Sequence, residues 1–329
     1  MSANYTQAAS AIIERAGLEP VLLDVGASGD PPEVWRPFAC RSTFIGFDPD
    51  LRDMRETDNG PYKKSYLVNC AVVADAGQRE AKVFLTRSPY CSSTLEPDLP
   101  ALRDYIFADL FEVEKETTVP AETINSVLAR LKIDRLDWIK IDTQGTDLRV
   151  YLSISPELRA HILAVDIEPG LIDAYKGEDN FLECHAAICK DGFWLSDLEV
   201  QGTVRMRRDT LSSLEPQNPL FQYKVLTHCL KTNPGWVNAR YLRTPQWLVE
   251  NKSDKDTWLT LFAFALIDKS LGFALDLAQV YQHQFGTDEN FQLMQETAIG
   301  LLNVSVRRNI PGLLRRGLRK IISLVRGRR

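Results

Sequence analysis

Short apolar runs separated by glycine, proline and acidic turns recur through the first 200 residues. Runs of this kind are typical of buried β-strands, and we expect strands at residues 20–25, 42–47, 66–73, 81–86, 136–142, 161–167 and 193–198. Helical spacing appears between them, at residues 7–15, at residues 121–131 and in a segment that ends near Cys189. This alternation predicts an α/β fold with a doubly wound, mostly parallel sheet, whose ligands lie at the carboxyl ends of its strands.

The second half of the chain follows a different pattern. Residues 201–234 are expected to be irregular, and residues 236–242 to form a closing edge strand. Helical spacing then dominates, with helices expected at 256–270, 273–285 and 289–303 and aromatic residues that would pack in a core. We therefore expect a domain over residues 1–245, a helical module over 246–306 and a basic tail over 307–329.

Composition and charge narrow the classes of protein. The 329 residues include 44% hydrophobic and 25% charged residues, which is ordinary globular composition. The net charge of −5 argues against a nucleic-acid binder, but it conceals an asymmetry: residues 307–329 hold nine basic and no acidic residues, so residues 1–306 carry −14. The six cysteines form no C-x-x-C pair and no secretory signal precedes them, so we expect reduced thiols, no metal site and a cytoplasmic protein.

The first expected strand leads into a glycine turn that carries candidate binding chemistry. Asp24, Gly26, Ala27 and Gly29 lie where a strand gives way to a helix, and glycines there let the backbone approach a ligand. The G-x-G-x-x-G fingerprint of dinucleotide sites and the G-K-[ST] of phosphate loops are both missing. The turn therefore favours a ligand without a pyrophosphate.

Asp48 ends the second expected strand, where a carboxylate can accept both hydroxyls of a ribose. S-adenosyl-L-methionine fits these features, because it has a ribose, two cationic groups and no phosphate. The alternative is that Asp24 and Asp48 merely cap turns.

Residues 20–200 resemble the FkbM-type methyltransferases, a family of class I S-adenosylmethionine-dependent enzymes. The matching blocks are Leu23-Asp-Val-Gly-Ala27, Gly46-Phe-Asp-Pro49, Asn69-Cys-Ala-Val72, Ser92-Ser93, Ile139-Lys-Ile-Asp-Thr-Gln-Gly145, Asp166-Ile-Glu168, Ala174-Tyr-Lys-Gly177 and Asp191-Gly-Phe193. The family's pattern in the fifth block is K-x-D-x-E-G-x-E, from which Gln144 and Asp147 depart. The resemblance implies O-methylation of a sugar hydroxyl in a glycan, a glycolipid or a secondary metabolite, with Asn69, Ala71 and Gln144 contacting the cofactor.

Two carboxylates at the ends of expected central strands are candidate general bases, Asp142 first and Glu168 second. Their alternatives are a helix cap and a solvated turn acid, respectively. Other functions remain open: N- or C-methylation by the same fold, or a non-catalytic adaptor that acts through the helical module and the tail. A homo-oligomer is also left open.

The basic tail has the spacing of an amphipathic helix. Between Ile310 and Arg326, apolar residues fall on one side at 100° per residue and basic residues on the other. We expect this segment to bind an anionic membrane surface, which would make the protein peripheral at the inner face of the membrane. Docking on the acidic body or on a partner helix is the alternative.

Overall fold

The computed structural model describes residues 4–27, 29–49 and 60–326, and their side chains as far as Ile310. Within these residues the chain divides into two compact units, Glu19–Thr244 and residues 1–18 together with Pro245–Arg329. Residues 1–18 group with the C-terminal helices because α1 (Tyr5–Arg15) buries Ala9, Ile12 and Ile13 and packs against α10 (Lys255–Ile267).

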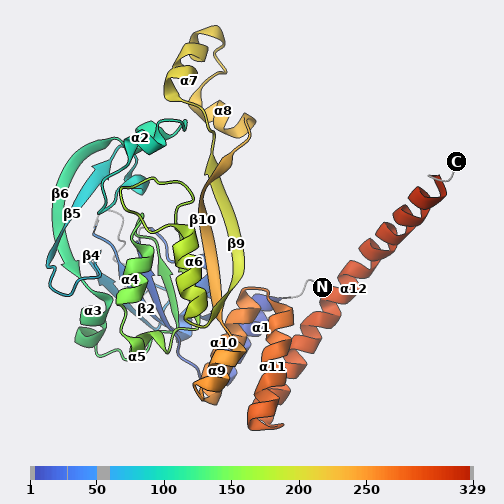
Figure 1. Ribbon diagram of the computed structural model, residues 1–329. Helices are drawn as coiled ribbons and strands as arrows, with labels where there is room; N and C mark the ends of the chain where they lie inside the picture. The colour runs from blue at the N-terminus through green and yellow to red at the C-terminus, as the bar shows by residue number, and fades with distance from the viewer. Residues whose placement is uncertain (1–3, 28, 50–59, 327–329) are drawn as a thin grey trace. The chain divides into compact units, whose positions relative to one another are not determined.

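The unit Glu19–Thr244 is built on a large sheet, which the described residues form from seven strands in the order β3-β2-β1-β7-β8-β10-β9. The strands are β1 (Val21–Val25), β2 (Thr43–Phe47), β3 (Lys64–Val68), β7 (Trp138–Ile141), β8 (Ala164–Ile167), β9 (Phe193–Thr203) and β10 (Asn233–Arg243). Strands β3, β2, β1, β7 and β8 pair in parallel, whereas β10 runs antiparallel to both β8 and β9. The expected α/β arrangement with a mostly parallel sheet is confirmed (Figure 1).

A smaller sheet of order β4-β6-β5 packs within the same unit. Its strands are β4 (Ala71–Val72), β5 (Glu80–Thr86) and β6 (Val113–Glu122). The unit's helices and 3-10 turns are η1 (Glu33–Arg41), η2 (Pro89–Cys91), α2 (Leu99–Leu102), η3 (Ala108–Phe111), α3 (Ile124–Leu131), α4 (Asp147–Ser153), α5 (Pro156–Arg159), α6 (Phe181–Lys190), α7 (Arg208–Leu214), η4 (Glu215–Gln217) and α8 (Tyr223–Cys229).

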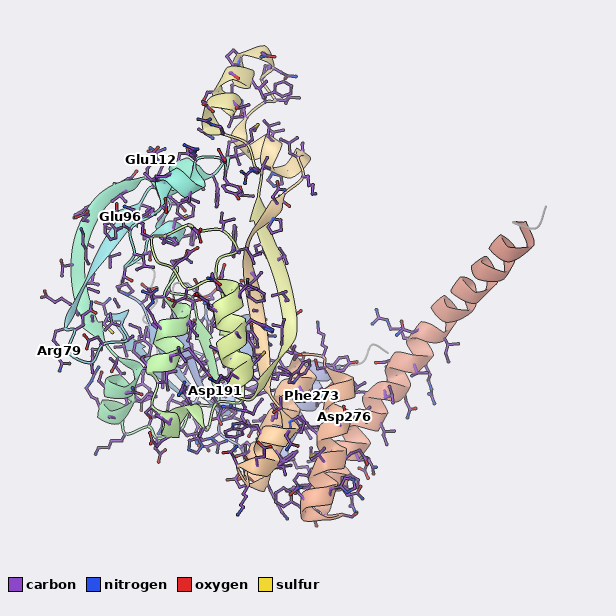
Figure 2. The ribbon with its side chains drawn as sticks, viewed as in Figure 1. Arg79, Glu96, Glu112, Asp191, Phe273 and Asp276 are labelled. Atoms are coloured by element: carbon purple, nitrogen blue, oxygen red, sulfur yellow. The ribbon has the colours of Figure 1, made fainter. Side chains whose placement is uncertain are left out.

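Alternation along the strands gives the large sheet two covered faces. On one face, buried residues of α3, α4 and α6 pack with Leu23, Ile139 and Val165 in a single core cluster. On the other face, the rings of Trp35 and Phe38 from η1 pack against Trp138. Figure 2 labels Asp191 at the end of α6, where it accepts a hydrogen bond from the Tyr151 hydroxyl of α4 (2.5 Å).

The structure corrects several sequence expectations in this unit. The strand at 236–242 is not the sheet edge, because β10 pairs on both sides and β9 occupies the edge. The helix expected from Ala121 starts at Ile124, where the Thr123 side chain caps it by accepting from Ser126 N, and Ala121 itself lies in β6, which ends at Glu122. The strand expected at 66–73 divides into β3 and β4. Residues 201–234, expected to be irregular, include the end of β9 and helices α7 and α8.

The second unit is helical, with α1, α9 (Pro245–Glu250), α10, α11 (Leu271–Phe285) and α12 (Glu289–Arg326). Buried side chains on successive turns hold the bundle together, such as Ala274 and Leu277 of α11, while Asp276 between them is exposed (Figure 2). The Tyr5 hydroxyl of α1 lies 3.0 Å from Ser305 Oγ of α12. The helix expected to stop at 303 and restart at Pro311 is instead continuous to Arg326. Across the described residues, no helix is both long and apolar enough to cross a bilayer.

Candidate functional site

The carboxyl ends of β1 and β7 meet at a cavity of about 1000 Å³. From β1 the chain proceeds to β2 and β3 on one side, and β7 leads to β8 on the other, so the strand order reverses between β1 and β7. Open α/β sheets bind ligands at such a reversal, outside the carboxyl ends of the strands. The cavity is also lined by the loop around Ser88–Ser93, by β6 and by the segment Gly170–Glu178.

The glycine turn after β1 is pressed against the end of β7. Gly26 has φ +87°, and a Cβ placed on it would lie 2.3 Å from the backbone oxygen of Asp142. The amide nitrogens of Gly26 and Ala27 both donate to Phe47 O at the end of β2 (2.9 Å each). Only glycine fits at position 26, because any side chain there would force apart the strand ends that form the cavity.

Asp48, Asn69 and Ala71 gather beyond the ends of β2 and β3. Asp48 is buried and lines the cavity, as does Ala71. Asn69 does not line it, but its side-chain nitrogen donates to the backbone oxygen of Asp48 (3.0 Å), so Asn69 fixes the turn that presents Asp48. Of the predicted residues of the first turn, Gly26 lines the cavity, whereas Ala27 and Gly29 do not.

Asp24 also lies away from the cavity wall. It sits opposite Lys140 in the parallel β1–β7 pair, with 3.2 Å between Asp24 Oδ1 and Lys140 Nζ. Burial raises the pKa of Asp24, and the ammonium of Lys140 opposes that rise. Burial alone would lower the pKa of Lys140, but the charges of Asp24 and Asp142 outweigh it and the net shift is upward, so the lysine stays charged. Asp24 thus pairs with Lys140 and does not line the cavity.

Asp142 comes directly after β7 and projects into the cavity with its side chain 24% exposed. Lys140 Nζ lies 3.6 Å from Asp142 Oδ2, and Gln144 Nε2 donates to Asp142 Oδ1 (2.7 Å). The backbone of Gln144 is left-handed, with φ +57°, which bends the chain back so that its side chain reaches Asp142. The Asp142 carboxylate is therefore held from two sides.

Gln144 is in turn fixed by residues from other loops. Ser93 Oγ donates to the Gln144 backbone oxygen (2.7 Å), and the Tyr175 hydroxyl donates to Gln144 Oε1 (3.1 Å). The bond from Tyr175 orients the amide so that its nitrogen faces Asp142. Ser93 and Tyr175 lie in blocks that resemble the FkbM family, but the sequence predicted no role for them.

Glu168 follows β8 and lines the same cavity. Burial, reinforced by the negative charge of Asp142 and by a hydrogen bond with it, raises the pKa of Glu168 to about 8. Burial likewise raises the pKa of Glu178, another lining residue, to about 7. At neutral pH Glu168 therefore mostly holds its proton.

Residues 36–193 match the family model described as the methyltransferase FkbM domain. This stretch of the chain is similar to the FkbM methyltransferase domain. A search of curated proteins found none that matches. The FkbM match covers Asp48, Asn69, Ala71, Asp142, Gln144 and Glu168 and begins after the glycine turn that holds Asp24, Gly26, Ala27 and Gly29.

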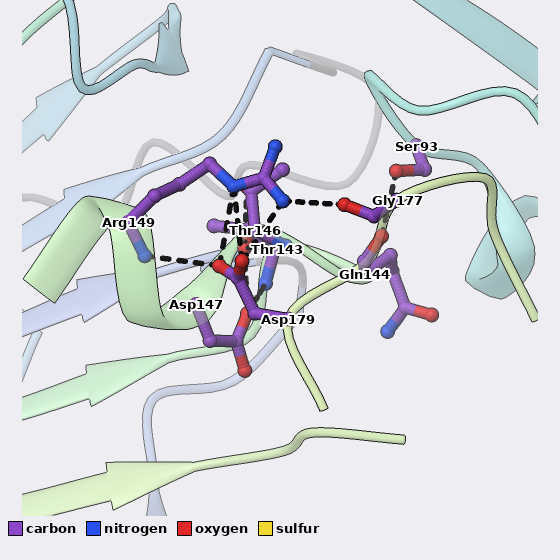
Figure 3. A network of polar contacts seen from close by, with 8 residues as sticks. All are labelled: Ser93, Thr143, Gln144, Thr146, Asp147, Arg149, Gly177 and Asp179. Atoms are coloured by element: carbon purple, nitrogen blue, oxygen red, sulfur yellow. Dashed lines mark hydrogen bonds and ion pairs between the residues drawn. The ribbon is translucent and has the colours of Figure 1, made fainter. Parts of the chain in front are cut away.

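Asp147, which departs from the family pattern, contacts two segments that border the cavity (Figure 3). Asp147 is buried at the start of α4, where Oδ1 accepts from Thr143 N (3.0 Å) and Thr143 Oγ1 (2.6 Å) and Oδ2 accepts from Glu168 N (3.0 Å). Burial raises its pKa to about 6. Asp147 thereby joins the segment after β7 to the segment after β8 and sets the spacing between Asp142 and Glu168.

Arg149 also holds in place a segment that lines the cavity, Gly170–Glu178. Arg149 of α4 forms an ion pair with Asp179 (2.8 Å) and donates to the Gly177 backbone oxygen (2.5 Å), as Figure 3 shows. These bonds hold the segment that contains Tyr175 and Glu178 against α4. The sequence offered only one signal for this loop, the block from Ala174 to Gly177.

Proposed function

We propose that this FkbM-like domain is an S-adenosylmethionine-dependent O-methyltransferase, and that its acceptor is a hydroxyl of a sugar in a glycan, a glycolipid or a secondary metabolite. The observation that supports it most is the position of the Asp142 carboxylate. It lines the cavity where the strand order reverses, and it contacts both Lys140 and Gln144. A fixed carboxylate in a cavity can align an acceptor hydroxyl and take its proton.

The residues around the cavity fit the proposed cofactor. Asp48 and Asp142 line it with carboxyl oxygens, which favours a cationic ligand, and Asp48 could accept ribose hydroxyls. Gly26 lets the backbone come close, Ala71 adds an apolar surface, and Gln144 can position polar groups. Asn69 would act through Asp48, and Asp24 through Lys140. When bound, S-adenosylmethionine would supply an electrophilic methyl group on a sulfonium.

Asp142 is the base in this proposal. Methyl transfer forms a bond from the acceptor oxygen to the methyl carbon and breaks the bond from carbon to sulfur, while the hydroxyl proton passes to an Asp142 oxygen. Gln144 and Lys140 hold the Asp142 carboxylate in place from two sides.

The proposed role of Glu168 in the reaction differs from that of Asp142. With a pKa near 8 it is mostly protonated at neutral pH, so it can donate a hydrogen bond to Asp142 or to the acceptor, and we assign the base to Asp142 instead. Asp147 is a positioning residue, because it contacts Thr143 and the backbone of Glu168 and does not contact the base itself.

Transfer of a labelled methyl group tests the proposal. Full-length protein is incubated with methyl-labelled S-adenosylmethionine and fractionated cell extract, with lipid-linked and soluble pools kept apart. Label should enter a carbohydrate as a methyl ether. Asp142→Asn should lose about 100-fold or more of the rate, whereas the exposed Asp134→Asn, a matched control, should keep it.

Two results would contradict the proposal. Label on nitrogen or carbon would retain the methyltransferase and exclude the hydroxyl acceptor. If no fraction were labelled above the Asp142→Asn background, the domain would be a non-catalytic adaptor.

A further inference from the structure

Helix α12 has two apolar faces, and the bundle covers one of them. Phe291, Met294, Ala298 and Leu301 are buried. Ile299, Leu302, Val306 and Ile310 are instead 38 to 47% exposed, and their spacing of three or four residues makes them one stripe along the helix. At about 100° per residue, the two sets lie roughly 100° apart around the helix axis.

The exposed stripe lies on a helix that is much longer than its neighbours. α12 has 38 residues, compared with 15 in α11 and 13 in α10. At ~1.5 Å per residue it is ~57 Å long against ~22 Å for α11. α12 therefore continues far beyond the ends of α10 and α11 (Figure 1).

The charge of this part of the chain is of one sign. After Glu296 the sequence contains nine basic residues and no acidic residue. Beyond Ile310 the sequence keeps the helical spacing of apolar residues, with Leu313, Leu314, Leu318, Ile321, Leu324 and Val325, and the backbone stays helical to Arg326. The apolar stripe continues into a segment whose charged residues are all basic. This combination suits a surface that has negative charges over an apolar layer.

We propose that residues 299–326 form a membrane-surface helix that lies on an anionic bilayer. The stripe from Ile299 to Ile310 enters the boundary between headgroups and acyl chains, and the Arg and Lys residues contact lipid phosphates. A second copy of the chain is a poor occupant, because pairing two such helices brings two sets of seven positive charges together. A nucleic acid could satisfy the charge, but it gives exposed aliphatic side chains no apolar phase to enter.

Vesicle sedimentation tests this proposal with the full-length protein. Vesicles of phosphatidylcholine alone are compared with vesicles that contain phosphatidylglycerol. The protein should pellet with the anionic vesicles and at least tenfold less with the neutral ones. The double variant Val306→Ser with Ile310→Ser should lose at least tenfold in partition coefficient. Gln292→Ser, a change at an exposed polar residue of the same helix, should not change it.

Each other outcome overturns the proposal. If the double variant still binds anionic vesicles fully, the stripe does not enter the bilayer and the tail acts by charge alone. If the wild type ignores anionic vesicles but retains RNA, the surface is a nucleic-acid site. If the double variant instead turns a dimer into a monomer on size-exclusion chromatography, the stripe is an interface between copies. Circular dichroism shows whether the variant keeps its helices, and Leu302→Ser replaces it if it does not.

Discussion

Strand β7 begins and ends beside an aspartate, and the two aspartates have opposite surroundings. Asp137, before the strand, is fully buried; its Oδ2 accepts from Val21 N (2.8 Å) and its Oδ1 from Arg135 Nε (2.6 Å). Asp142, after the strand, is 24% exposed in a cavity of about 1000 Å³. Asp137, which joins β1 to β7, is thus only five positions from Asp142, which faces the cavity.

The difference shows which end of this parallel sheet leaves side chains available to contact a ligand. At the amino end, the backbone of Asp137 also bonds to Val21 and Leu163, so every group there serves the packing of neighbouring strands. At the carboxyl end, Asp142 keeps a face toward the cavity, and its partners Lys140 and Gln144 fix the carboxylate without covering it. Substitutions at the two ends should therefore affect different measurements.

The largest effect should come from Asp137→Ala. It leaves Val21 N without its side-chain acceptor and removes the buried carboxylate that accepts from Arg135, which should lower the free energy of unfolding by about 3 kcal/mol. Urea unfolding measures this change. The exposed Asp134→Ala, three positions upstream, should stay within about 0.5 kcal/mol of the wild type. Equal stabilities of the two variants would show that Asp137 does not hold the sheet.

Asp142→Asn should produce the reverse pattern. The amide has nearly the same shape, so stability and cofactor affinity should change little, while the turnover number falls by about 100-fold because no base takes the proton. Steady-state kinetics beside urea unfolding separates the two quantities. A variant with normal turnover would remove the base assignment from Asp142 and leave catalysis to alignment alone.

Gln144→Glu should change the pH dependence of the reaction rate, an effect smaller than that of Asp142→Asn. The substitution replaces the amide that donates to Asp142 by a second carboxylate, which favours protonation of the base. The acidic limb of the pH–rate profile should move upward by about one pH unit. Gln144→Met, which removes the hydrogen bond without adding charge, is the control. An unmoved limb would mean that Gln144 is not coupled to proton transfer.

The smallest effect concerns stability against pH. The pKa of Glu168 is near 8 in the folded protein and near 4.5 in an exposed glutamate, so the folded state binds the proton more tightly. Its contribution to stability is full below about pH 4.5 and is lost as the pH rises through about 8. The wild type should therefore lose more stability than Glu168→Gln between pH 6 and pH 9 in urea unfolding. Parallel losses would argue against a protonated Glu168.

Local patterns were sufficient to predict the elements that depend on neighbours in sequence. The alternation of strands and helices, the glycine turn at Gly26 and the carboxylates at the strand ends could all be read from short segments. The edge position assigned to the strand at 236–242 was wrong, because strand order depends on pairing between distant residues, here Ala239 with Ile167 and Leu198.

The site shows the same division. Asp48, Asp142 and Glu168 were predicted because each directly follows a strand. The contact of Asp24 with Lys140 depends on the register between β1 and β7, which the sequence does not reveal, and so Asp24 was expected at the ligand. Asp147 was noted only as a departure from the family pattern, since its contact with Glu168 N spans 21 residues. Ser28 lies outside the described residues.

Calorimetric titration of the full-length protein with S-adenosylmethionine tests most directly that the carboxyl end of this sheet is a cofactor site. The wild type should bind the cofactor at one site per chain. Asp48→Ala, which removes the proposed acceptor of the ribose hydroxyls, should weaken binding by about 30- to 150-fold, the equivalent of roughly 2 to 3 kcal/mol. No binding by the wild type, or unchanged affinity in Asp48→Ala, would contradict this assignment.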